Sequence, residues 1–205
     1  MSIVDIAMKG GYLMYFLFIL SIISVALFIE RWLSIRKASK FEEQTYIGVL
    51  SKISQNKTAD AAADCKFSDS PFFKIFEQGL TYAESDILLA QETIEQHASH
   101  FVRSLEKSLG TISTFAAVGP LIGFLGTVTG MIRVFMNLSQ HGGGLDIQLL
   151  SGGIYEALVT TVGGLIVGIF CIIFHNFLTS KIEAIAFVVE EKVNSVCMHL
   201  RRNVK

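Results

Sequence analysis

Charged residues are scarce in this chain of 205 residues, of which only 17% are Asp, Glu, Lys or Arg. Soluble proteins contain roughly 25%. The net charge of −1 gives no reason to expect a nucleic-acid partner. HExxH, GxSxG and P-loop motifs are absent, so we expect neither an enzyme nor a bound cofactor. The three cysteines, an odd number, argue against a disulfide framework.

Three windows, residues 10–29, 108–132 and 157–180, contain no charged residue. Each is close to the ~20 residues that a helix needs to cross a hydrocarbon core of about 30 Å. The first window has no small-residue cleavage site before Glu30, so we interpret it as a retained helix. The predicted segments are 1–11 (outer N-terminal segment), 12–30 (transmembrane), 31–109 (cytoplasmic helical region), 110–136 (transmembrane), 137–153 (outer loop), 154–178 (transmembrane) and 179–205 (cytoplasmic C-terminal helix).

The orientation follows from the distribution of Lys and Arg. Ten of the 17 lie between the first and second spans and five follow the third, whereas residues 137–153 have none. The positive-inside rule therefore places the N-terminus outside and both the large loop and the C-terminus inside.

No segment shows a strand signal, so the predicted fold class is an all-α membrane protein. Its three transmembrane helices carry long cytoplasmic helical extensions. Spacing and caps predict a first helix continuing towards Ile53, a short helix over Thr58–Cys65, a helix over Phe72–Tyr82 capped by Ser70, a helix capped by Ser85 or Asp86 that runs unbroken into the second span, and a long last helix with one apolar stripe.

The second and third spans each present a face of small residues and hydroxyls when projected at about 100° per residue. The residues on these faces are Ala116, Gly119, Gly123, Gly126, Thr127 and Gly130 in the second span, and Gly153, Glu156, Ala157, Thr160, Gly164 and Gly168, with Thr161 at the edge, in the third. Tight helix packing explains one such face. Two matched faces and a carboxylate favour a polar pathway.

Glu156 is the carboxylate, at the outer end of the third span. It is a functional candidate or a helix-start acid favoured by the macrodipole. Arg133 either snorkels to the interface or pairs with Glu156, and we favour a structural role. His97 and His100 lie three apart on a helix, but no further ligand completes a metal site, so we expect a solvated face and no metal.

No Asp or Glu lies in the middle of any span. A proton path needs a group inside the membrane that binds and releases a proton, and threonine cannot do this. If the chain handles ions, the titrating carboxylate belongs to another polypeptide.

At these motifs the sequence resembles the MotA/TolQ/ExbB proton-channel family, and within it the ExbB/TolQ branch. The resemblance rests on GPLIGFLGTVTGMI at 119–132 and IYEALVTTVGGLIVG at 154–168, with KGGY at 9–12, Glu30-Arg31 and His175-Asn176 in support. Proteins of the MotA branch have four spans, so three spans favour the ExbB/TolQ branch.

The resemblance implies a homopentamer around a central pore lined by the second and third spans. Two copies of a single-span partner of the ExbD/TolR type would each bring an aspartate. The implied ion-pathway residues are Thr127, Thr160, Thr161 and Glu156, and the implied pore-facing small residues are Gly119, Gly123, Gly126, Gly130, Ala157 and Gly164. The transported ion would be H⁺, with Na⁺ as the alternative.

The expected function is that of a stator subunit of an ion-driven motor in the bacterial inner membrane, surrounded by lipid. With its partner it would energise TonB-dependent transport across the outer membrane. The alternatives are a TolQ-like subunit that acts through a TolA-like protein in envelope integrity or division, a gliding or flagellar-type stator, and a scaffold that transduces nothing. The partner binds the load, so this chain's sequence leaves the load open.

Overall fold

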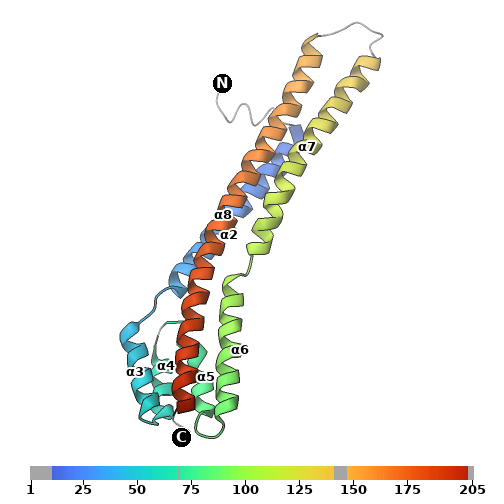
Figure 1. The fold of residues 1–205 in the computed structure, drawn as a ribbon. Coiled ribbons are helices and arrows are strands. Elements are labelled where there is room, and N and C mark those ends of the chain that lie inside the picture. The colour runs from blue at the N-terminus through green and yellow to red at the C-terminus, as the bar shows by residue number, and fades with distance from the viewer. Residues whose placement is uncertain (1–10, 69, 141–146, 203–205) are drawn as a thin grey trace. The chain divides into compact units, whose positions relative to one another are not determined.

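The computed structural model describes residues 11–68, 70–140 and 147–202, and all regular structure in these ranges is helical. This confirms the all-α prediction for the described residues. Parts of the two predicted outer segments, residues 1–10 and 141–146, lie outside them. The helices are α2 (Gly11–Ala38), α3 (Glu43–Ser54), α4 (Thr58–Phe67), α5 (Lys74–Tyr82), α6 (Ile87–Leu105), α7 (Leu109–Gln140) and α8 (Ile147–Arg202) (Figure 1).

The chain forms two compact units. In the first, α2 up to Ile29 and α7 pack with α8 up to Phe177. Among the described residues, three helices are long and apolar enough to cross a membrane, judged by length and composition: α2, the second within Ile87–Ser139 and the third within Leu150–Arg202. This confirms the prediction of three spans, while the segment boundaries stay predictions.

Within this unit α2 packs on α8 and keeps most of its bulky surface exposed. The Phe28 ring stacks on the Phe174 ring with centroids 4.3 Å apart, and Met14 lies over Gly163. Most other large apolar side chains of α2, such as Phe18, are exposed in the isolated chain. An exposed apolar surface of this kind suits lipid, as expected for the first span.

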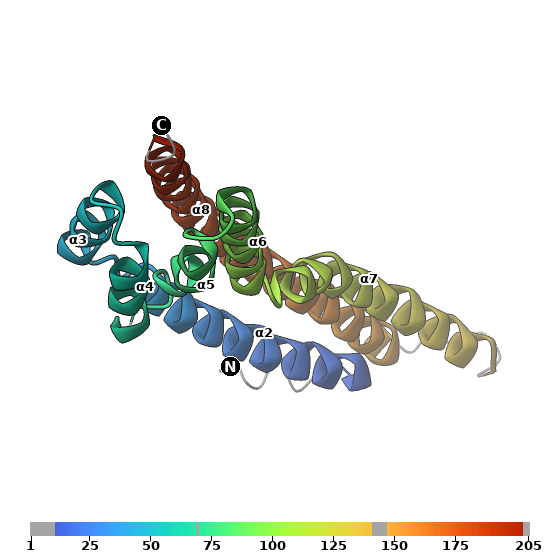
Figure 2. The same cartoon turned by 90° about the horizontal axis from the view of Figure 1, so that it is seen from below.

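The second unit contains α3 to α6 and the C-terminal part of α8. Figure 1 shows α3, α4 and α5 grouped around the end of α8, and in Figure 2 the helices α3 to α6 follow one another. Their shared core buries aromatic side chains against the apolar stripe of α8. Its main members are Tyr46, Phe72, Phe73 and Phe76, with Val189, Val193, Val196 and Leu200 from the stripe.

Hydrogen bonds of the buried residues Tyr46 and Gln91 also hold α3 and α6 to α8 within this unit. The Gln91 amide is 4% exposed; its Nε2 donates to the Cys197 carbonyl at 3.0 Å, and its Oε1 accepts from Arg201 Nε at 3.1 Å. Tyr46 donates its hydroxyl proton to the Lys192 carbonyl at 3.2 Å, and burial raises the pKa of this tyrosine. Satisfied buried polar groups of this kind fix one arrangement of the helices.

Two predicted helix continuities are wrong. The first helix ends at Ala38 rather than continuing towards Ile53. The expected unbroken helix into the second span is interrupted between Leu105 and Leu109, where Ser108 has a φ of +69°. A left-handed residue ends an α-helix. Arg31 Nη1 donates to the Ser104 carbonyl near this end at 3.3 Å.

Of the predicted helix caps, one is confirmed and one is wrong. Asp86 caps α6, since its Oδ1 accepts from the Leu89 amide at 3.0 Å, which confirms one of the two predicted caps. The prediction that Ser70 is the cap is wrong, because Phe73 is the N-cap residue of α5, and the Ser70 hydroxyl donates to the Lys40 carbonyl at 2.8 Å. Helix α5 instead begins at Lys74 without a side-chain cap.

Candidate functional site

The two small-residue faces meet each other in a close contact between α7 and α8, which lie side by side in Figure 1. A Cβ added at Gly164 would lie 2.6 Å from the Gly119 carbonyl oxygen and 2.8 Å from the Gly123 Cα. One added at Gly123 would lie 3.1 Å from the Cα of Thr161. Glycine is therefore required here so that the two backbones can touch, as in small-residue contacts of membrane helices.

The contact continues along the helices. The position of a Cβ at Gly126 is occupied by the Thr160 side chain, and one at Gly130 would lie 2.8 Å from the Ala157 Cβ. Within one chain, six small residues therefore serve tight helix packing. They are Gly119, Gly123, Gly126, Gly130, Ala157 and Gly164. A pore-facing role for them stays a prediction.

The candidate threonines make two kinds of hydrogen bond, one between helices and two within their own helices. Thr161 Oγ1 donates across the contact to the Gly123 carbonyl at 2.8 Å. Thr160, which is 2% exposed, donates to the Glu156 carbonyl of its own helix at 2.9 Å. Thr127 is half-buried and donates to the Phe124 carbonyl at 2.7 Å. Each hydroxyl uses its proton in a backbone bond and retains acceptor capacity on its oxygen.

The candidate carboxylate is paired. Arg133 Nη1 lies 3.3 Å from Glu156 Oε1, with 55% of the arginine side chain and 33% of the glutamate side chain exposed. The structure therefore favours the pairing alternative for Arg133 over snorkelling. Whether Glu156 or the threonines handle ions stays a prediction.

Two further residues, Gly11 and Thr129, lie beside the Arg133–Glu156 pair. Neither was a candidate site residue from the sequence. Gly11 has a φ of +66°, and the position of its absent Cβ is occupied by the Glu156 carboxylate. Thr129 lines a cavity of about 10 Å³ together with Gly11, Arg133 and Glu156. The doublet Gly10-Gly11 at the start of a span was the available signal, because a positive φ favours glycine.

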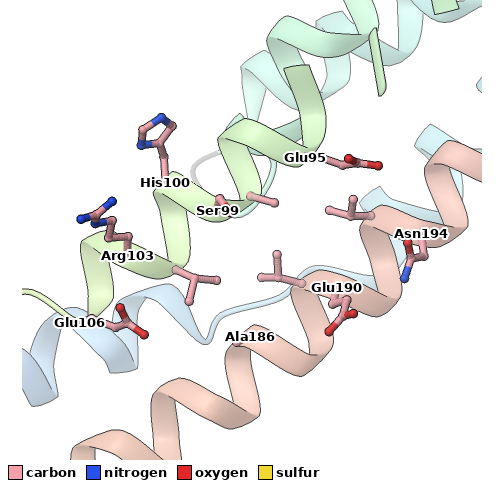
Figure 3. Close-up of a pocket in the computed structure, with 12 residues that line it drawn as sticks. Glu95, Ser99, His100, Arg103, Glu106, Ala186, Glu190 and Asn194 are labelled. Atoms are coloured by element: carbon pink, nitrogen blue, oxygen red, sulfur yellow. The ribbon is translucent and has the colours of Figure 1, made fainter. Parts of the chain in front are cut away.

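The second unit contains a groove of about 780 Å³ between α6 and α8 (Figure 3). Glu95, His100 and Glu190 are among the residues that line it. In the part of the chain that the structure describes, no group of three or more His, Cys, Asp or Glu residues is arranged to hold a metal. The prediction that His97 and His100 bind no metal stays a prediction.

Fold and site together define a multi-pass α-helical membrane protein whose last two spans pack through small residues. Residues 67–191 match the model of the MotA/TolQ/ExbB proton channel family. The chain belongs to this family, in its ExbB-like branch.

Named relatives agree with this assignment. The chain is 33% identical over 184 residues to a biopolymer transport protein named ExbB-like 1 of Synechocystis sp., covering 87% of this chain and 71% of the relative. It is 26% identical to the biopolymer transport protein ExbB of Neisseria meningitidis, over 78% and 77% of the two chains. It is 37% identical to the Tol-Pal system protein TolQ of Haemophilus influenzae, over 41% and 36%.

Family membership and the three apolar helices make this a multi-pass inner-membrane protein. Members of this family are membrane channel proteins that serve transport, and they are not enzymes. The homologues named ExbB and TolQ assign the chain to the stator-type subunits of this proton-channel family.

Proposed function

We propose that the chain is the stator subunit of a proton-driven motor in the bacterial inner membrane, and that it energises TonB-dependent transport together with a single-span partner. Family membership supports this. The orientation in the proposal has the N-terminus in the periplasm and the second unit in the cytoplasm, as the Lys and Arg distribution favours.

One observation carries the proposal. The uncharged windows of the second and third spans contain hydroxyls but no Asp or Glu, so this chain offers no carboxylate within these windows to carry a proton. A partner of the ExbD/TolR type with a membrane aspartate would supply it. In the proposed assembly two partner copies stand inside a ring of five copies of this chain.

The proposed cycle depends on neutralising that aspartate. A charged carboxylate facing an apolar wall costs several kcal/mol, so the partner moves past the wall only after the aspartate has bound a proton from the periplasmic side. Next to a hydroxyl such as that of Thr127 the charged form gains a hydrogen-bond partner and the proton leaves to the cytoplasm. Alternating loading and release then drives one component against the other.

The load of the motor has a second candidate. The match to TolQ of Haemophilus influenzae, at 37% identity over 84 residues, favours a TolQ-like role in which the work passes to a TolA-like protein. A gliding or flagellar-type load would use the same machinery. The genes beside this one discriminate: a neighbouring TonB or TolA gene identifies the load.

Substitution of the two threonines tests the proposal against a scaffold that transduces nothing. We expect Thr127→Val to preserve assembly, because the Thr127 hydroxyl donates to the Phe124 carbonyl of its own helix. We expect it to abolish transport-dependent growth, because valine offers the charged partner aspartate no hydrogen bond. Thr161→Val also removes a bond between helices, so assembly must be measured with growth. Thr127→Ser and Thr161→Ser, which keep the hydroxyl, are the matched controls. Full growth of both valine variants would refute the transducing role.

A further inference from the structure

Residues of all three membrane helices come together at one ion pair. Glu156 of α8 lies 3.3 Å from Arg133 of α7, and Gly11 at the start of α2 packs against the same carboxylate. The cavity between them has a volume of about 10 Å³, which is room for about one water molecule.

The oxygens around this cavity are of the kind that bind a small hard cation. The residues that line the cavity and carry side-chain oxygens are Glu156, Thr129 and Thr160. Thr129 donates its proton to the Leu125 carbonyl at 2.9 Å, so its oxygen retains acceptor capacity, and Thr160 donates to its own helix. Carboxylate and other oxygen ligands suit hard cations, and without Arg133 this set would suit a sodium ion.

We propose that Arg133 makes the periplasmic entrance of the motor selective for protons over sodium ions. This rests on the proposed function, and it assigns a residue that determines the ion selectivity of the same path. The guanidinium is always charged and contacts the carboxylate oxygen that a sodium ion would need. It repels a second cation in the same small cavity.

A proton meets a much lower barrier at the same place. It needs a single lone pair of the carboxylate or one bridging water, whereas a sodium ion needs several oxygen ligands at once. An ion pair as exposed as this one contributes little to stability, so stability alone gives a weak reason for an arginine at this position.

The experiment uses the full chain in complex with its single-span partner, reconstituted in lipid vesicles that report proton and sodium flux separately. The variants are Arg133→Gln and Arg133→Met, with Arg133→Lys as the charge-conserving control. Arg103→Gln, an arginine on α6 in the other unit (Figure 3), controls for loss of one positive charge. Size-exclusion chromatography checks the assembly of each complex first.

We expect both neutral variants to keep proton flux and to raise the ratio of sodium to proton flux about tenfold, the order expected for removing a nearby charge at a partly exposed site. Arg133→Lys and Arg103→Gln should keep the wild-type ratio. An unchanged ratio in both assembled neutral variants overturns the inference, and so does loss of their proton flux. A wild-type complex that conducts no protons refutes the proposed function itself, which is a different result.

Discussion

Replacing Gly164 by alanine tests the close contact between α7 and α8. The added Cβ would lie 2.6 Å from the Gly119 carbonyl oxygen, 2.8 Å from the Gly123 Cα and 2.9 Å from the Gly123 nitrogen. All three atoms belong to the backbone of the opposite helix, so no flexible side chain can move to make room. The helices must separate, and the contact opens at neighbouring positions as well.

Overpacking of this kind costs about 1–3 kcal/mol. For a chain of this size 1 kcal/mol shifts the melting temperature by roughly 2–4 °C, so Gly164→Ala should lower it by about 2–12 °C. Thermal unfolding of the detergent-solubilised protein, followed by far-UV circular dichroism, measures the shift.

Gly152→Ala is the matched control in the same helix. A Cβ added at Gly152 has nothing within 4 Å, and alanine is favoured over glycine in a helix by up to about 1 kcal/mol. The control should therefore leave the melting temperature unchanged or raise it. If the two variants unfold at the same temperature, the α7–α8 contact is not as close as described.

Three further predictions concern other parts of the chain. Gly11→Ala should lower the melting temperature and displace the Glu156 carboxylate, because the φ of +66° strains alanine and the carboxylate occupies the position of the added Cβ; a variant as stable as wild type would contradict this. Asp86→Ala should destabilise by about 1 kcal/mol in chemical denaturation, since the Leu89 amide loses its acceptor. Burial raises the pKa of the Cys65 thiol from 9.0 to about 12, so this thiol should resist maleimide in the native protein. The free energy of unfolding should fall as the pH rises from about 9 to 12, because in this range only the unfolded chain loses the thiol proton.

The membrane helices were predictable from the sequence because the bilayer imposes a simple length and charge rule. The sequence also showed which residues share the small face of each helix, and the structure adds that the two faces contact each other, with Gly123 against Gly164. Helical projection shows which residues share a face but not what the face contacts. For that reason the sequence alone could not decide between a helix contact and a pore wall.

Features decided by tertiary contacts were not predictable. The interruption at Ser108 has no glycine or proline signal, and the nearby hydrogen bond from Arg31 to the Ser104 carbonyl joins residues far apart in the chain. Serine rarely adopts a positive φ, so nothing local favoured a break there. The aromatic core around Phe73 and Phe76 was missed for the same reason, since it forms among short helices whose mutual packing is not encoded in their individual periodicity.

The most direct test of the central claim asks which polypeptide carries the titrating group. Proton uptake is measured in vesicles under a membrane potential with this chain alone, with its single-span partner, and with a partner whose membrane aspartate is changed to asparagine. The account predicts uptake only with the unaltered partner, because the uncharged windows of this chain contain no carboxylate. Equal uptake by this chain alone, or by the complex with the asparagine partner, would contradict it.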